Sequence, residues 1–260
     1  MKKFIAMLLA LTMLLALAGC ASSEPAATQA PTEAPATEAP ATEAPATEAA
    51  TEAPTEAAAA VMTHEEYMAT ALDSAVTIET YVQAHQSWWD NKVTVYCQNP
   101  DGAYFLYELA CSEEDAAKLV PGTKILVNGF KGEWAGEVEV MDGTFEFVEG
   151  GDTFIAEALD VTALLGTDEL ITHQNEFVSF TGMTVEAISY KNDEPGDDIY
   201  LTLGYNGASY DFCVEVYLTG TESDVYTTVG TLNVGDTVNV EGFLYWYEGV
   251  NPHITAIALA

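Results

Sequence analysis

Apolar and polar side chains alternate along most of the chain beyond residue 60. This two-residue period is typical of β-strands with one buried face, because successive side chains point to opposite faces of a sheet. In the first half of this region the alternating runs are "VTIETYVQA" (76–84), "KVTVYCQ" (92–98), "AYFLYEL" (103–109), "EVEVM" (137–141) and "TFEFVE" (144–149). The turn sequence "NPDG" joins the second run to the third. Asp142 and Gly143 predict a further hairpin between the last two runs.

Two short helical segments interrupt this strand pattern. Thr63 and Glu66 fit a capping box, the reciprocal hydrogen-bonded pair that begins many helices. Ser112, followed by charged residues, predicts a second short helix over 112–119. A second series of strands then comprises "FVSFTGMTVEA" (177–187), "IYLTLGY" (199–205), "SYDFCVEVYL" (209–218), "TVNVEGFLYWYEG" (237–249) and "HITAIAL" (253–259). In this series, a polar connection from Thr219 to Thr231 is expected in place of the second helix.

The two series of strands share a sequence pattern. The stretch "GTKILVNGFKGEWAGEVEV" (122–140) returns as "GDTVNVEGFLYWYEGVNPHI" (235–254), with Gly129 aligned on Gly242 and Phe130 on Phe243. A glycine inside a strand marks a bend or a close approach of two backbones. We therefore predict two copies of one small β unit, at 61–160 and 177–260, joined by a helical linker at 161–176.

Residues 1–20 have the pattern of a secretory signal peptide. Lys2 and Lys3 precede the apolar run "FIAMLLALTMLLAL", which is short for a membrane span. The run ends in "LAGC", which resembles the lipobox of bacterial lipoproteins. That resemblance implies that Cys20 becomes the new N-terminus and carries a lipid. The protein is then expected on the extracytoplasmic face of the cell membrane.

Residues 21–60 consist mostly of alanine, threonine, glutamate and proline, with repeats of "TEAP". The segment holds no aromatic side chain and cannot build a core, so it is expected to be disordered. Its prolines block long helices and its glutamates repel one another, which extends the chain. These properties predict a tether between the membrane and the β units.

The order of strand, hairpin, short helix, glycine-bent strand and closing strand resembles the OB-fold, a five-stranded Greek-key barrel. With the lipobox and the repeated "G…V.GF" segment, the chain is similar to the tandem OB-fold-like lipoproteins of Gram-positive bacteria, a family largely without assigned activity. The resemblance covers residues 64–260 and implies a mostly β protein with two tandem barrels. It brings no catalytic motif with it.

The charge of the chain is strongly negative. It carries 41 Asp and Glu against 7 Lys and Arg, for a formal net charge of −34, and none of the seven cations is an arginine. Binding to phosphate backbones relies on clustered Lys and Arg. Nucleic acid is therefore not expected as a partner.

The sequence holds no recognisable catalytic constellation. The four histidines are His64, His85, His173 and His253. None has a second histidine at the spacing of a zinc-binding helix, and no serine or cysteine stands in a nucleophile motif. Exposed histidines without a catalytic role are the expectation. We predict that the protein is not an enzyme and that it has no metal site and no cofactor.

Aromatic residues are the candidate ligand-binding groups. OB-folds bind ligands on the face of strands 2 and 3 and with the loops after strands 1 and 4. By this placement the candidates are Trp88, Trp89, Tyr104, Tyr107 and Trp134 in the first copy, and Tyr190, Tyr245, Trp246 and Tyr247 in the second. The alternative is that these rings close the barrel ends or pack one barrel on the other.

These observations predict a surface-anchored, non-catalytic binding lipoprotein of the cell envelope. Its ligand is expected to be a glycan, a wall polymer or a peptide. One alternative is an accessory or scaffold subunit that binds only protein. A second alternative, oligonucleotide binding, rests on the OB-fold resemblance alone.

Overall fold

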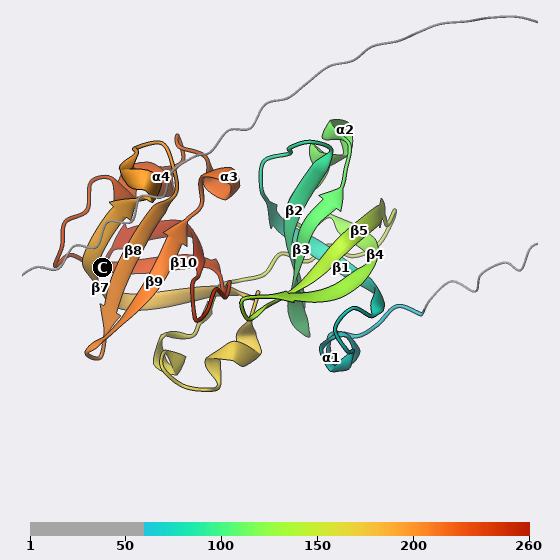
Figure 1. Cartoon of the computed structure of the whole chain (residues 1–260), viewed down its shortest axis with the longest axis horizontal. Coiled ribbons are helices and arrows are strands. Elements are labelled where there is room, and N and C mark those ends of the chain that lie inside the picture. The colour runs from blue at the N-terminus through green and yellow to red at the C-terminus, as the bar shows by residue number, and fades with distance from the viewer. Residues whose placement is uncertain (1–59) are drawn as a thin grey trace, which may run out of the picture. The chain divides into compact units, whose positions relative to one another are not determined.

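The computed structural model describes residues 60–260 (Figure 1). The predicted signal peptide, the lipidation site at Cys20 and almost all of the predicted tether lie outside these residues. No helix within the described part has the length and apolarity needed to cross a bilayer. The described part is mostly β, as the strand pattern predicts.

The first barrel contains five strands and two short helices. They are α1 (His64–Ala69), β1 (Ala75–His85), β2 (Lys92–Asn99), β3 (Gly102–Ala110), α2 (Glu113–Ala116), β4 (Lys124–Trp134) and β5 (Glu137–Phe147). The sheet order is β1-β2-β3-β5-β4, and β1 also pairs with β4, which closes the barrel. The parallel pairing of β3 with β5 completes the strand order of an OB-fold. The predicted fold class is confirmed.

Both helices of the first barrel begin at the predicted caps. The Thr63 side chain accepts a hydrogen bond from the Glu66 N–H, and the Glu66 carboxylate accepts one from the Thr63 N–H. The Ser112 hydroxyl accepts a hydrogen bond from the Asp115 N–H at the start of α2. These side chains satisfy backbone donors that have no partner inside a helix.

The hairpin predicted at Asp142 and Gly143 is wrong. Strand β5 continues through both residues, and they form a bulge opposite Gly129 of β4. Asp142 takes up the left-handed conformation, with φ of 50°. A side chain at Gly129 would meet the Met141 carbonyl at 2.9 Å, so the bulge requires glycine there.

The second barrel repeats the same strand order. Its elements are β6 (Leu159–Asp160), β7 (Phe177–Tyr190), β8 (Ile199–Tyr205), β9 (Ala208–Val214), α3 (Val216–Thr219), α4 (Asp224–Val229), β10 (Thr237–Phe243) and β11 (His253–Leu259). The sheet order is β10-β11-β9-β8-β7-β6, and β10 also pairs with β7. Short 3-10 turns η1 (Thr162–Leu164) and η2 (Leu170–His173) precede β7, and η3 (Lys191–Asp193) follows it.

The connection between β9 and β10 differs from the expectation. The sequence predicts a polar link without a helix, whereas the structure contains α3 and α4. Ser223 caps α4 through its hydroxyl, and Val225, Tyr226 and Val229 are buried in the core of the second barrel. The polar residue Thr228 lies between these apolar residues in the sequence and obscures their helical spacing.

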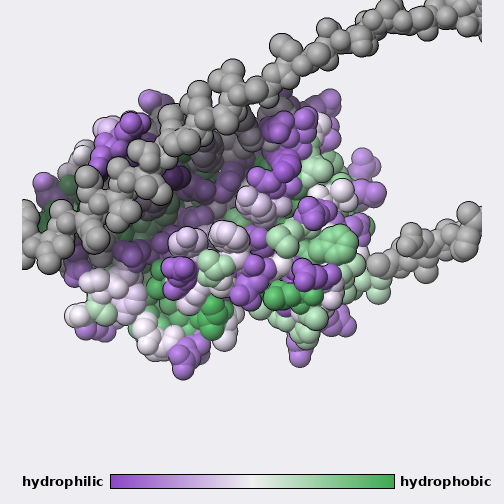
Figure 2. Space-filling view, viewed as in Figure 1, coloured by the Kyte–Doolittle hydropathy of each residue, from purple (hydrophilic) through white to green (hydrophobic). Residues whose placement is uncertain are grey.

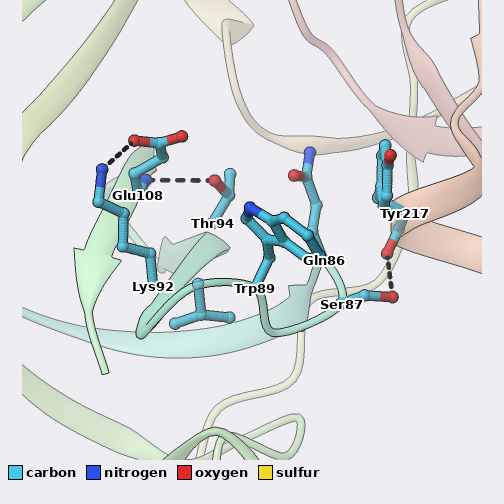
Figure 3. Close-up of a pocket in the computed structure, with 8 residues that line it drawn as sticks. Gln86, Ser87, Trp89, Lys92, Thr94, Glu108 and Tyr217 are labelled. Atoms are coloured by element: carbon cyan, nitrogen blue, oxygen red, sulfur yellow. Dashed lines mark hydrogen bonds and ion pairs between the residues drawn. The ribbon is translucent and has the colours of Figure 1, made fainter. Parts of the chain in front are cut away.

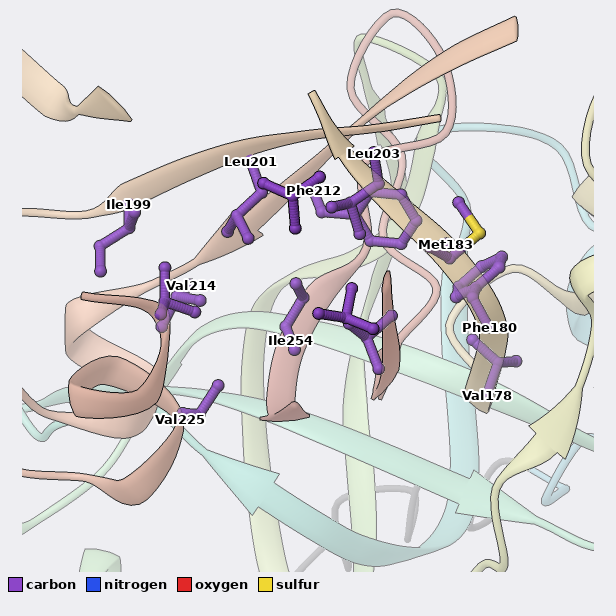
Figure 4. Close-up of a cluster of buried hydrophobic side chains, with 14 of the residues drawn as sticks. Val178, Phe180, Met183, Ile199, Leu201, Leu203, Phe212, Val214, Val225 and Ile254 are labelled. Carbon is purple, nitrogen blue, oxygen red and sulfur yellow. The ribbon is translucent and has the colours of Figure 1, made fainter. Parts of the chain in front are cut away.

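Each barrel has its own hydrophobic core. The first is built around side chains such as Ile78, Leu106 and Val127, and the second around Phe180, Leu203 and Phe212 (Figure 4). A third cluster joins the two barrels. It consists of Tyr96 and Phe105 from the first barrel and Phe243 from the second, and the Tyr96 and Phe243 rings stack with centroids 4.5 Å apart.

Candidate ligand-binding site

A tight hairpin between β1 and β2 presents Trp89 at the surface. Asp90 and Asn91 form its two-residue turn, with φ of 47° and 61°. Trp89 and Lys92 exchange both backbone hydrogen bonds, at 3.0 and 2.9 Å. A turn with two left-handed residues favours Asn and Asp and matches the twist of the strands. The turn fixes the Trp89 backbone, yet its side chain is 77% exposed.

A bulge in β3 shapes the neighbouring surface. Val93 pairs with Leu109 and Val95 with Leu106, so Thr94 faces two residues, Tyr107 and Glu108. Both are exposed, which interrupts the alternation of β3. The Glu108 N–H donates to the Thr94 hydroxyl at 3.2 Å, and Glu108 has φ of 48°.

The bulge directs Glu108 toward Lys92. The Lys92 Nζ lies 2.6 Å from a Glu108 carboxylate oxygen. This hydrogen bond raises the pKa of the Lys92 ammonium. Both side chains are half exposed, so the pair adds little stability. The pair places an ammonium and a carboxylate, whose charges offset each other, beside Trp89.

These residues border a pocket of about 350 Å³. Its lining consists of Gln86, Ser87, Trp89, Lys92, Val93, Thr94, Glu108 and Tyr217 (Figure 3). In this view Trp89 and Gln86 lie between the Lys92–Glu108 pair and Tyr217. The volume is within the range of small-molecule sites, and the lining combines aromatic rings with a few polar groups, as such sites do. We call it the Trp89 pocket.

The second barrel supplies one wall of the Trp89 pocket. The Tyr217 carbonyl in α3 accepts hydrogen bonds from the Ser87 N–H at 2.7 Å and the Ser87 hydroxyl at 3.2 Å. The Tyr217 ring itself is 58% exposed. The pocket therefore needs both barrels in contact.

A buried polar cluster lies behind the pocket. The Gln86 amide donates to Glu215 at 2.7 Å, and the Tyr96 hydroxyl donates to the same carboxylate at 3.2 Å. The Tyr96 hydroxyl also lies 2.6 Å from the His253 Nδ1. Burial raises the pKa of Glu215 to about 7 and lowers that of His253 to about 4. The cluster holds Gln86 in position from inside the protein.

His253 corrects the expectation of exposed histidines. It is 8% exposed, and its ring stacks on Tyr245 with centroids 4.2 Å apart. The sequence places it beside Pro252, where no periodic pattern indicates burial. It is buried because β11 contacts the first barrel, which the local sequence does not reveal.

The predicted aromatic residues of the first barrel do not form one surface. Trp89 lines the pocket, and Tyr107 stands on the adjacent bulge. Trp88 is partly buried against the core and donates its indole N–H to the Cys111 carbonyl at 2.9 Å. Tyr104 is 1% exposed, so the prediction that it lines the ligand face is wrong. Trp134 is 62% exposed but does not line the pocket.

The predicted aromatic residues of the second barrel are also divided. Tyr190 and Trp246 pack against the core of that barrel, and Tyr245 packs against Phe105 at the contact between barrels. Tyr247 is 52% exposed. These positions favour the alternative of barrel closure and packing for Tyr190, Tyr245 and Trp246.

The sequence analysis predicts none of the polar lining and only one of the two aromatic rings of the pocket. Gln86 and Ser87 follow the first predicted strand and Thr94 lies in the second, but nothing in their order marks them as ligand groups. Tyr217 was assigned to a strand instead of a helix. Across residues 60–260, no three His, Cys, Asp or Glu side chains are grouped as metal ligands would be. The three cysteines of this region, Cys97, Cys111 and Cys213, are free and buried.

No protein-family model matches the chain, and no curated protein is similar to it in sequence. Solved structures are similar to it in fold. A murine DNA-binding protein bound to double-stranded DNA is 12% identical, with a TM-score of 0.35 and coverage of 71% of this chain and 96% of that one. The Ifi202 HINa domain in complex with 20-bp double-stranded DNA is 10% identical, with a TM-score of 0.34 and coverage of 72% and 98%.

A replication protein A heterotrimer bound to single-stranded DNA is also similar in fold. It is 13% identical, with a TM-score of 0.30, and the match covers 72% of this chain and 48% of that one. All three of these structures contain bound DNA, whereas the sequence led to the expectation that nucleic acid is not a partner of this chain. That expectation took the net charge of the whole chain as a measure of one binding face. Part of the acidic charge lies in the "TEAP" repeats, outside both barrels.

Proposed function

We propose that the two barrels form a non-catalytic ligand-binding module whose site is the Trp89 pocket. The observation that carries this proposal is Trp89 itself. A tryptophan that is 77% exposed stands on a tight, hydrogen-bonded turn beside a pocket with polar walls. Exposed aromatic rings with a hydrogen-bonding neighbourhood are favourable contact groups, because they offer a large apolar area at a small cost in side-chain entropy.

The chemistry of the lining favours a neutral sugar ring. Trp89 and Tyr217 provide aromatic faces against which the C–H face of a sugar can pack. The Gln86 amide and the Ser87 and Thr94 hydroxyls can exchange hydrogen bonds with sugar hydroxyls. Lys92 and Glu108 neutralise each other, so the pocket offers no unpaired charge from this pair.

Single-stranded oligonucleotide is the second candidate ligand. The Trp89 pocket lies on the β2–β3 face and the loop after β1, where OB-folds bind both oligonucleotides and oligosaccharides. An exposed aromatic ring can stack on any base, for about 1–3 kcal/mol per base. Binding of oligothymidylate that is weaker at the higher of two salt concentrations would favour this candidate over sugar.

The change Trp89→Ala is expected to weaken binding at least about tenfold while leaving stability nearly unchanged. The ring is mostly exposed, so its loss removes contacts with the ligand but little of the core. The measurements are calorimetric titration of residues 60–260 with N-acetylglucosamine and its β-1,4-linked oligomers, and unfolding in denaturant.

The matched control is Trp134→Ala, which removes another mostly exposed tryptophan ring that lies outside the Trp89 pocket. It is expected to leave both affinity and stability unchanged. Equal affinities of the wild type and Trp89→Ala would contradict the assignment of the site. A fall in the unfolding free energy of about 3 kcal/mol for Trp89→Ala would instead show that the ring is structural.

We propose further that a lipid on Cys20 anchors the module to the extracytoplasmic face of the membrane. The "LAGC" pattern after an apolar run supports this proposal. Replacing Cys20 by alanine is expected to release the protein from the membrane fraction of expressing bacteria into the medium. Metabolic labelling with a fatty acid would be lost in the same variant. Unchanged membrane retention with unchanged labelling would contradict the proposal.

A further inference from the structure

We propose that the Trp89 pocket is one of two adjacent subsites, and that the ligand is a neutral oligosaccharide that occupies both. The second subsite is a hollow beside Tyr107, on the other side of the Lys92–Glu108 pair. We call it the Tyr107 hollow. This inference rests on the proposed function of the Trp89 pocket and extends it to a ligand of more than one sugar unit.

The Tyr107 hollow has a volume of about 480 Å³. Its lining includes Asp90, Lys92, Tyr107, Glu108, Met141 and Asp142. Lys92 and Glu108 line both this hollow and the Trp89 pocket. The two concavities are therefore neighbours separated by one ion pair, which suits a chain of linked units better than a single small molecule.

Two bulges on neighbouring strands build the hollow. One is the bulge of β3 at Tyr107 and Glu108, and the other is the bulge of β5 at Asp142 and Gly143. Strands β3 and β5 pair in parallel, so both irregularities fall in the same part of the sheet. Bulges redirect side chains and are over-represented next to functional sites. The described pairings of β3 and β5 contain no other register shift, so both irregularities of these strands fall at this one place in the barrel wall.

The backbone around the hollow is unusually irregular. Asp90, Asn91, Glu108 and Asp142 all have positive φ, between 47° and 61°. For a residue such as glutamate this conformation carries an energetic cost, because the Cβ atom crowds the backbone. The left-handed conformation of Glu108 leaves the Tyr107 ring exposed and holds the Glu108 carboxylate against Lys92. Such a local cost is expected where a surface is shaped for a ligand.

The chemistry of the hollow matches that of a sugar. Tyr107 is 44% exposed and offers a ring face and a hydroxyl. Asp90, Asp142 and Thr144 supply oxygen atoms that can accept hydrogen bonds from sugar hydroxyls. The carboxylates outnumber the single ammonium of Lys92, so uncharged units fit the hollow better than anionic ones.

The test is the dependence of affinity on ligand length. The full chain is titrated with N-acetylglucosamine and with its β-1,4-linked dimer, trimer and tetramer. The wild type is expected to bind the oligomers about tenfold or more tightly than the monosaccharide. Tyr107→Ala is expected to abolish that gain and to leave the monosaccharide affinity within about twofold. Trp89→Ala is expected to weaken binding of every member of the series.

Tyr200→Ala is the matched control. Tyr200 is 41% exposed, on β8 of the second barrel, and lines neither concavity. This variant is expected to retain the full gain with length. Its retention would show that the loss in Tyr107→Ala is local to the hollow.

The outcomes separate the two proposals. Monosaccharide binding that is lost in Trp89→Ala, without any gain with length, would overturn the second subsite and leave the proposed function standing. A gain with length that persists in Tyr107→Ala would also overturn it. Absence of binding by the whole sugar series would overturn both. A length-dependent affinity seen only with oligothymidylate would replace the sugar by an oligonucleotide and overturn the oligosaccharide proposal.

Discussion

Replacing Phe243 by alanine is expected to lower the unfolding free energy by about 3–5 kcal/mol, the range for a buried phenylalanine. Phe243 is 3% exposed and ends β10 of the second barrel. Its ring stacks on Tyr96 of the first barrel and lies 5.3 Å from Phe177, centroid to centroid. The substitution therefore opens a cavity in the cluster that joins the barrels, and it weakens the wall of the Trp89 pocket that depends on this contact.

The internal repeat provides a matched control for this change. Phe130 occupies the equivalent position of β4, directly after Gly129, but it is 46% exposed. Phe130→Ala is expected to cost less than about 1 kcal/mol, because little buried area is lost. Urea unfolding followed by tryptophan fluorescence measures both variants. A loss for Phe243→Ala as small as that expected for Phe130→Ala would show that the contact between the barrels contributes little to stability.

The fold could be predicted because its determinants are local. Alternating apolar residues set the strands, and glycines such as Gly129 and Gly242 mark the bent strand in each copy. The hairpin predicted at Asp142 failed because a bulge inside a strand and a turn use the same residue types. Only the pairing partner distinguishes them, and for Asp142 that partner is Gly129 of β4, which is not a neighbour in the sequence.

Phe130 and Phe243 show why the contact between the barrels could not be predicted. Their local sequences are alike, and only the neighbour across the contact makes one buried and the other exposed. The same reason hides Glu215 and His253, whose partners Gln86 and Tyr96 lie in the other barrel. A sequence pattern reports on one strand or helix, whereas these environments depend on two barrels.

The candidate site could be predicted only in part. Trp89 was identified from its place in the loop after β1. The sequence analysis assigns Tyr104 to the ligand face, but strict alternation places Tyr104 with Leu106 on one face of β3 and Phe105 with Tyr107 on the other. In the structure Tyr104 and Leu106 lie in the core of the first barrel, Phe105 lies in the cluster between the barrels, and Tyr107 is exposed. That signal was available in the sequence. The position of Tyr217 was not, because it depends on helix α3 contacting the first barrel through Ser87.

The second large effect expected is a loss of stability with rising pH that depends on Glu137. Its side chain is fully buried at the start of β5. One carboxylate oxygen accepts hydrogen bonds from the Trp246 N–H at 2.8 Å and the Gln174 amide at 3.2 Å. The other, within the described residues, has no hydrogen-bond partner. Burial therefore raises the pKa of Glu137 to about 8.

The direction of the effect follows from this pKa. The folded protein holds the proton more tightly than the unfolded chain, whose Glu137 has an ordinary pKa of 4.5. The stability linked to this proton is complete below about pH 4.5 and is lost as the pH rises through about 8. Each tenfold change in proton affinity is worth about 1.4 kcal/mol, so the loss is at most about 5 kcal/mol.

Glu137→Gln isolates this contribution, because glutamine has the same shape and no charge. The unfolding free energy of the wild type is expected to fall between pH 5 and pH 9 by several kcal/mol more than that of the variant. Glu139 and Glu215, whose pKa values burial raises to about 7, leave the variant with a smaller slope of the same sign. Glu146→Gln, at an exposed position of the same strand, is the control and should keep the slope of the wild type.

Trp246 and Gln174 belong to the second half of the chain. An ionised Glu137 carboxylate is therefore expected to destabilise the contact between the two barrels. Equal slopes for the wild type and Glu137→Gln would show that Glu137 is already ionised at pH 5, and that the junction tolerates its charge.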